Sequence, residues 1–153
     1  ENKTLYFAYG KNCNNECMLK RCPGAKQIGE AVLYNHTFII DERGQVGGFA
    51  SVKRQEGSEV RGIAWLIPNN EIKNNLDKAE GVNMTPPVYR KETMKIHILG
   101  TDQFNVEALV YVSNKKEGFY ARDDYIETIL TGLKQNLVYE FDEKSYRSHI
   151  KLS

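Results

Sequence analysis

Long hydrophobic runs are absent from the 153 residues of this chain. Its 41% hydrophobic and 27% charged residues are ordinary values for a globular domain, and no segment has the length and apolarity of a membrane span. The formal net charge is only +1, so no overall positive field would attract nucleic acid or anionic lipid. We therefore expect neither a nucleic-acid nor a membrane partner, and we expect ligands to be recognised at a local site.

The first residues do not form an apolar segment that ends in small residues, so we expect no signal peptide. We therefore expect a cytoplasmic protein. The length is close to the commonest size of one domain, and the chain contains no repeats or low-complexity tracts. This predicts a single domain over residues 1–153, with 139–153 as a possible tail. Monomer and homodimer both remain open.

Cysteine is scarce, and all three cysteines lie in one short stretch, at Cys13, Cys17 and Cys22. An odd number cannot form a complete set of internal disulfides. Structural zinc usually takes four nitrogen or sulfur ligands, and the chain has no CxxC or HxxxH pair to supply them. We expect reduced, partly buried thiols and no metal; a zinc site on this cluster is the alternative.

Several catalytic and cofactor-binding motifs are lacking as well. There is no P-loop and no GxGxxG, so nothing predicts a nucleotide cofactor, and we expect none of any kind. The three histidines, His36, His97 and His149, are not placed beside a cysteine, serine or aspartate in a recognisable nucleophile motif. We expect them to be structural.

The residues that are present predict an α+β fold. Alternating apolar residues indicate about six strands, at 3–9, 27–40, 49–54, 59–67, 88–98 and 106–113. Their connections are mostly too short for helical crossovers, which favours antiparallel pairing in a strongly curved sheet or barrel. Cap residues and apolar stripes predict flanking helices at 14–21, from Pro68 to Glu80, and from Asp123 onward.

A polar bend follows the first predicted strand. In the sequence FAYGKN, residues 7–12, the apolar strand ends abruptly at Gly10, Lys11 and Asn12. One interpretation is an ordinary turn. The other is a bend that presents backbone N–H groups and small polar side chains to a ligand.

Glu80 lies at an unfavourable place for a carboxylate, in the last turn of a predicted helix. Ile72, Leu76 and Ala79 form the apolar stripe of that helix, and Gly81 is suited to a left-handed cap. The partial negative charge at a helix C-terminus opposes a carboxylate and tends to raise its pKa toward the range of a general base. A solvated residue at the helix end is the alternative.

The order of motifs along the chain resembles the γ-glutamylcyclotransferase family, which includes γ-glutamylamine cyclotransferase and AIG2-like proteins. The resemblance runs from Leu5 to about Leu133 through FAYGKN, MLKRCPGA, GEAVL, GGFASV, VRGIAWLI, LDKAEGV, VYRKE and ALVYV. It implies a small antiparallel β-barrel with flanking helices. It also implies a cofactor-independent acyltransferase that cyclises a γ-glutamyl group to 5-oxoproline and releases an amine or amino acid.

The same resemblance implies roles for individual residues. Glu80 matches the catalytic glutamate of the family, and the loop Tyr9, Gly10, Lys11 and Asn12 would hold the glutamyl group of the substrate. Intramolecular attack by the substrate's own amine requires no enzyme nucleophile, which agrees with the missing nucleophile motif.

Two tyrosines are further candidates for the site, and position 11 differs from the residue that many family members have. Tyr125 matches a family tyrosine that lines the pocket, and Tyr89 is a further candidate, with a core strand residue as its alternative. Many family members have serine where this chain has Lys11, so the leaving group stays open among glutathione-like, amino-acid, isopeptide and amine groups. The alternative function is a module that binds glutamyl-like ligands without turnover.

Overall fold

The computed structural model describes residues 2–137 together with 144 and 147. The predicted tail at 139–153 lies outside these residues, apart from 144 and 147, as does His149. The strands are β1 (Lys3–Ala8), β2 (Lys26–Asp41), β3 (Ala50–Pro68), β4 (Tyr89–Ile98), β5 (Val106–Ser113) and β6 (Glu117–Gly118). The helices are α1 (Asn15–Arg21), α2 (Asn69–Glu71), α3 (Asp77–Ala79) and α4 (Asp123–Asn136), with short turns η1 (Lys11–Cys13) and η2 (Gly44–Val46) and the π-helical turn η3 (Ile72–Leu76).

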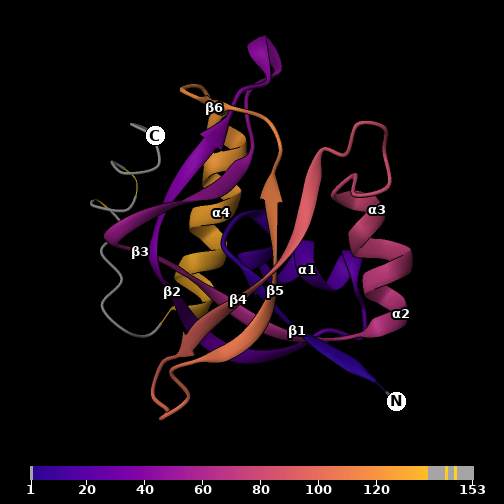
Figure 1. The fold of residues 1–153 in the computed structure, drawn as a ribbon, viewed down its shortest axis with the longest axis vertical. Coiled ribbons are helices and arrows are strands. Elements are labelled where there is room, and N and C mark those ends of the chain that lie inside the picture. The colour runs from indigo at the N-terminus through magenta and orange to yellow at the C-terminus, as the bar shows by residue number, and fades with distance from the viewer. Residues whose placement is uncertain (1, 138–143, 145–146, 148–153) are drawn as a thin grey trace.

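Five strands close into a barrel. They follow the order β3, β1, β5, β4 and β2, and β2 pairs again with β3, while β6 extends the edge of β2 (Figure 1). The predicted small β-barrel with flanking helices is confirmed. Antiparallel pairing holds for every pair except β1 with β5, which is parallel. An odd number of strands cannot alternate in direction all the way round a closed ring, so closure requires a parallel pair.

The predicted strands at 49–54 and 59–67 belong to one long strand, β3. Residues 55–58 bulge out between Arg54 and Glu59, opposite Asn35 on β2. Asn35 has a φ of 61°, and its side-chain oxygen accepts a hydrogen bond of 3.1 Å from the Gly57 N–H. Because a bulge increases local twist, it bends the β2–β3 ribbon without ending it.

Three helical segments flank the barrel. In Figure 1, α2 and α3 lie at the right of the view, α4 lies left of centre, and α1 lies between them. The helix predicted from Asp123 onward has an apolar face toward the core: Ile129 and Leu133 on α4 and Leu137 just after it are buried, and Tyr125 is half-buried. In the described part of the chain, every helix is too short or too polar to span a membrane.

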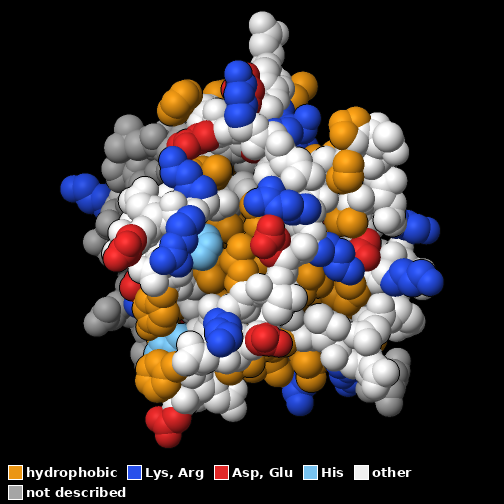
Figure 2. Space-filling model, in the orientation of Figure 1, with side chains coloured by type: hydrophobic (Ala, Val, Ile, Leu, Met, Phe, Trp, Pro, Cys, Tyr) orange, Lys and Arg blue, Asp and Glu red, His pale blue; other side chains and the backbone are white. Residues whose placement is uncertain are grey.

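The surface carries mixed charges, and the core consists of apolar and aromatic side chains. Lysine and arginine are interspersed with aspartate and glutamate on the face shown in Figure 2, in keeping with the small net charge. The core is built from fully buried aromatic and aliphatic side chains of the strands and helices, the largest being Trp65, Tyr111, Phe7 and Phe38.

Candidate active site

A cavity of about 680 Å³ opens at one end of the barrel, between the loop after β1, the end of α3 and the start of α4. All seven residues that the sequence analysis proposed for a site line this cavity: Tyr9, Gly10, Lys11, Asn12, Glu80, Tyr89 and Tyr125. They come from four separate segments of the chain. The fold therefore brings together groups that lie more than a hundred residues apart in sequence.

Glu80 is the C-cap of the helical segment that begins at Asn69 and ends at Ala79. The segment ends in a Schellman motif: Gly81 N–H donates to the Lys78 carbonyl at 3.1 Å, and Val82 N–H donates to the Asp77 carbonyl at 3.1 Å. Gly81 has a φ of 65°, as the sequence analysis predicted for a left-handed cap. This cap fixes the backbone from which the Glu80 side chain enters the cavity.

The pKa of the Glu80 carboxyl is raised to about 7. Burial is the main cause, and the positive charges of Arg21 and Arg43 partly oppose it. The helix end, on which the sequence argument rested, is thus not the leading cause, because surrounding protein excludes most of the water from the carboxylate. A carboxyl group with this pKa exchanges protons readily near neutral pH.

Asp77, one helical turn before Glu80, ties the end of the helix to the barrel. Its side chain is only 8% exposed; one carboxylate oxygen accepts a 2.6 Å hydrogen bond from the Tyr111 hydroxyl on β5. The other oxygen pairs with the Lys91 ammonium on β4 at 3.0 Å. These contacts hold α3 against two strands, so they also determine where Glu80 lies.

Replacing Tyr111 by phenylalanine is expected to lower the free energy of unfolding by about 1.5–3 kcal/mol, because the buried Asp77 carboxylate loses a hydrogen-bond donor. Urea unfolding at pH 7 measures the change. The matched control is Tyr120→Phe, which removes the same hydroxyl from an exposed tyrosine and should change stability by less than about 0.5 kcal/mol. Equal losses of stability in the two variants would contradict a stabilising role for the Tyr111–Asp77 hydrogen bond.

The loop after β1 forms a tight turn. Cys13 N–H donates to the Gly10 carbonyl and Asn14 N–H to the Lys11 carbonyl, both at 3.0 Å. The N–H groups of Lys11 and Asn12 begin this turn, so they have no partner within it. Gly10 is closely packed: an added Cβ would lie 3.0 Å from the Ala50 Cβ, so Ala50 would have to shift, and 3.5 Å from the Tyr125 hydroxyl.

Helix α4 supports this loop from behind. An added Cβ at Gly132 would lie 2.4 Å from the Asn14 nitrogen, so only glycine lets α4 approach so closely. The Asn136 side chain donates to the Cys13 carbonyl at 2.9 Å. Asn14 caps α1, because its side-chain oxygen accepts a hydrogen bond of 3.0 Å from Glu16 N–H. The bend is therefore a packed structure and not a loose surface turn.

Asn12 has an unsatisfied group on the cavity wall. Its side chain is 4% exposed, and its Nδ2 donates to the Tyr6 hydroxyl at 3.1 Å. Its Oδ1 has no hydrogen-bond partner among the described residues. Leaving a buried acceptor unpaired costs roughly 1–3 kcal/mol, so the side chain is suited to accept a hydrogen bond from a ligand N–H.

The predicted tyrosines differ in what their hydroxyl groups can still offer. Tyr125 accepts a 2.8 Å hydrogen bond from Ala50 N–H, which leaves its own proton available to a ligand. Tyr89 donates to the Ala50 carbonyl at 2.7 Å and Tyr9 to the Tyr111 carbonyl at 2.6 Å, so these two protons are already used. Burial raises the pKa of all three, which keeps the hydroxyls neutral.

Arg21, Arg43 and Tyr6 also line the cavity, and sequence reasoning assigned them no role. Arg43 binds the fully buried Asp41 carboxylate through two hydrogen bonds of 3.0 Å, and its guanidinium lies 4.4 Å from the centre of the Phe49 ring. The sequence pattern carries no signal for the two arginines, because neither belongs to a periodic stripe or a motif of known chemistry. Both reach the site only through the tertiary fold.

None of the three cysteines lines the cavity, although Cys13 belongs to the η1 turn. Cys13 and Cys22 are buried free thiols, and Cys17 is a partly exposed one. Burial raises the thiol pKa of Cys13 to about 12 and that of Cys22 to about 11, so both stay protonated at neutral pH. Within residues 2–137, 144 and 147, no three His, Cys, Asp or Glu side chains are grouped so that they could hold a metal ion.

Comparisons with known proteins give a consistent result. A family model described as gamma-glutamyl cyclotransferase, AIG2-like, matches residues 6–129. The gamma-glutamylcyclotransferase of Homo sapiens is 28% identical over 153 residues, covering 94% of this chain and 78% of the human protein. That of Mus musculus is 29% identical over 148 residues, covering 92% and 76%. A solved structure described as gamma-glutamyl cyclotransferase shares the fold, with a TM-score of 0.84 at 22% identity, covering 97% and 88% of the two chains.

Proposed function

Because this chain belongs to the gamma-glutamyl cyclotransferase, AIG2-like family, and is an enzyme of that type, we propose a specific reaction for it. It cyclises the γ-glutamyl group of a small γ-glutamyl amine or γ-glutamyl amino acid to 5-oxoproline and releases the free amine. The observation that carries the proposal is a carboxyl group of pKa about 7, on Glu80, in the same cavity as the Gly10–Asn12 turn.

The reaction is a proton-coupled amide exchange within one substrate molecule. A bond forms between the α-nitrogen and the γ-carbonyl carbon, and the bond from that carbon to the leaving nitrogen breaks. The α-nitrogen loses two protons on going from ammonium to lactam, and the leaving nitrogen gains two on becoming ammonium. Glu80 accepts these protons as the carboxylate and returns them as the acid, so the step balances without an oxidant or an enzyme nucleophile.

The remaining site residues are proposed to orient the glutamyl group. The N–H groups of Lys11 and Asn12 bind its carboxylate or the developing oxyanion, and Asn12 Oδ1 accepts from the α-amine. The Tyr125 hydroxyl donates its free proton to a substrate oxygen. Support comes from the unpaired Asn12 acceptor and from the positive potential of Arg21 and Arg43 around a site for an anionic substrate.

Lys11 affects the leaving group more than the reaction. Its side chain is exposed at the cavity mouth, whereas Asn12 and Tyr9 are buried in the wall. A serine at position 11, as in many family members, would present a hydroxyl to the ligand, and lysine instead presents a flexible cation. The alternative of a binding module without turnover is not favoured, because the relatives are named as enzymes.

Incubation of the full chain with a panel of γ-glutamyl dipeptides and γ-glutamyl amines tests the function. We expect 5-oxoproline and an equal amount of free amine from at least one substrate, measured by chromatography. The matched control is the corresponding α-glutamyl dipeptide, which carries the same atoms but has its γ-carboxylate free. Absence of 5-oxoproline from every γ-glutamyl compound would refute the proposed activity.

A further inference from the structure

Three exposed apolar side chains lie at the mouth of the cavity, beside charged ones. Val46 lies in η2, Phe49 just before β3, and Met84 in the loop between Gly81 and β4. They are 69%, 41% and 60% exposed, respectively, whereas the polar wall residue Asn12 is only 4% exposed. The cavity therefore has a polar floor and an apolar rim.

We propose that this rim, formed by Val46, Phe49 and Met84, is a subsite for an apolar leaving group on the γ-glutamyl substrate. The inference rests on the cyclotransferase function proposed above and names its substrate class: γ-glutamyl compounds whose amine half carries a large aliphatic or aromatic side chain. Exposed apolar area costs free energy in water, and a ligand that covers the rim recovers part of that cost.

The chemistry determines which half of the substrate meets the rim. The glutamyl half is ionic, so it takes the polar floor, where Asn12 and the turn N–H groups lie. The leaving nitrogen must be within reach of Glu80, which returns its proton. Met84 lines the same cavity as Glu80, and its sulfur lies 3.1 Å from the position that a Cβ on Gly81, the residue after Glu80, would occupy. A group attached to the leaving nitrogen thus runs outward past Met84.

Phe49 has a defined position on the other side of the mouth. Its ring centre lies 4.9 Å from that of Tyr125, and the Arg43 guanidinium stacks on it at 4.4 Å. An ordered aromatic ring binds an apolar group with little loss of side-chain entropy. Two segments that are distant in sequence therefore present apolar surface to the same opening.

The charged side chains at the cavity mouth predict a different preference for the leaving group. Lys11 and Lys78 are exposed there, and they could favour an acidic leaving group. Arg122 also lines the cavity, but it is paired with Asp124 at 3.0 Å. Exposed lysines are well solvated and gain little from a surface ion pair, so the apolar rim is the stronger determinant.

Steady-state kinetics on three matched dipeptides tests the subsite. We expect kcat/KM for γ-glutamyl-leucine to exceed that for γ-glutamyl-glycine by about tenfold, mainly through a lower KM, because an apolar side chain in a pocket contributes roughly this factor per small group buried. γ-Glutamyl-glutamate should be no better than γ-glutamyl-glycine. Release of 5-oxoproline is the common readout.

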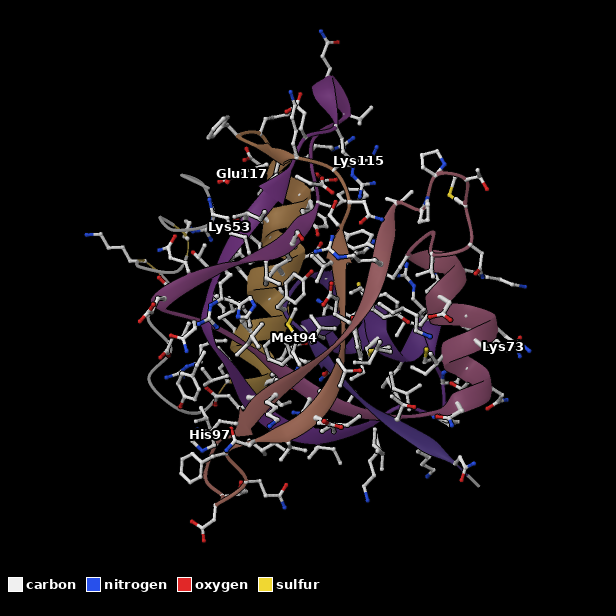
Figure 3. All side chains as sticks on the ribbon, in the orientation of Figure 1. Lys53, Lys73, Met94, His97, Lys115 and Glu117 are labelled. Atoms are coloured by element: carbon white, nitrogen blue, oxygen red, sulfur yellow. The ribbon has the colours of Figure 1, made fainter. Side chains whose placement is uncertain are left out.

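Substitutions in the rim test whether its side chains cause the preference for γ-glutamyl-leucine over γ-glutamyl-glycine. Met84→Ser and Val46→Ser should each lower the leucine-to-glycine ratio of kcat/KM by about threefold or more. The matched control is Phe104→Ser, which also removes a large hydrophobic side chain that is 54% exposed. Phe104 stacks on His97, which Figure 3 shows at the lower end of the barrel, and neither residue lines the cavity. This variant should leave the ratio unchanged.

The outcomes distinguish the two proposals. Equal or better turnover of γ-glutamyl-glycine refutes the apolar subsite and leaves the cyclotransferase function intact. A preference for γ-glutamyl-glutamate also refutes it and assigns specificity to Lys11 and Lys78. If none of the dipeptides yields 5-oxoproline, the proposed function fails and the subsite fails with it.

Discussion

Replacement of Glu80 by glutamine is expected to lower kcat by about 10²- to 10⁴-fold, the usual range for loss of a general acid or base. The amide is nearly isosteric with the carboxyl group, but it cannot accept the α-amine proton or return one to the leaving nitrogen. Release of 5-oxoproline under saturating substrate measures the loss.

The matched control for Glu80→Gln is Glu92→Gln. Glu92 lies on β4, and its carboxylate pairs with Arg90 in a mostly solvated ion pair of 2.7 Å. It has no contact with the cavity, so this substitution should leave kcat unchanged. Full activity in the Glu80→Gln enzyme would refute the catalytic role, whereas equal losses in both variants would indicate a general effect of charge removal.

The pH profile provides an independent readout of the same residue. Because the Glu80 pKa is about 7, the carboxylate form prevails above pH 7 and disappears below it. The kcat/KM of the wild-type enzyme should therefore fall about tenfold per pH unit on the acid side of pH 7. Residual activity of Glu80→Gln should lack this limb, and persistence of the limb would assign it to another group.

Stability should depend on pH in the opposite direction. Burial raises the Glu80 pKa from 4.5 to about 7, so the folded state keeps a proton that the unfolded state loses. The stability contributed by Glu80 is full below pH 4.5 and is lost as pH rises to 7. Glu80→Gln removes this loss and should unfold with a free energy about 1–3 kcal/mol higher than wild type at pH 8.

Replacement of Arg43 by methionine is expected to lower the free energy of unfolding by about 3–5 kcal/mol, because it leaves the fully buried Asp41 carboxylate without its cation. Asp41 keeps hydrogen bonds from Phe49 N–H and the Ser113 hydroxyl, but neither compensates a full charge. Urea unfolding at pH 7 measures the loss. Since Arg43 lowers the pKa of Glu80, the acid limb of kcat/KM should also move to higher pH.

Arg122→Met is the matched control for Arg43→Met. Arg122 pairs with Asp124 through two hydrogen bonds of similar length, but both side chains are mostly exposed. Because solvent screens an exposed pair of this kind, its removal should lower the free energy of unfolding far less than Arg43→Met does. Similar losses in the two variants would contradict the importance of burial, and an unchanged pH profile in Arg43→Met would contradict its effect on Glu80.

Local patterns in the sequence determined much of the fold and part of the site. The alternating strands, the buried Ile72 and Leu76, and the Gly81 cap depend on contacts within a few residues, so the chain itself specifies them. Ala79, predicted in the same apolar stripe, is exposed instead. The bend at Gly10 and the carboxylate at Glu80 were predicted for the same reason. Each is a local irregularity in an otherwise regular pattern.

The roles of residues that contact distant parts of the chain became apparent only in the tertiary structure. Nothing local indicates that Arg43 reaches the cavity, that Asp77 meets Tyr111, or that α4 can pack on the bend only because residue 132 is glycine. The parallel pairing of β1 with β5 follows from closing a ring of five strands, which no single segment encodes. The pKa of Glu80 belongs to this class too. The sequence placed the carboxylate at a helix end, but the barrel and its loops exclude the water, and that exclusion raises the pKa.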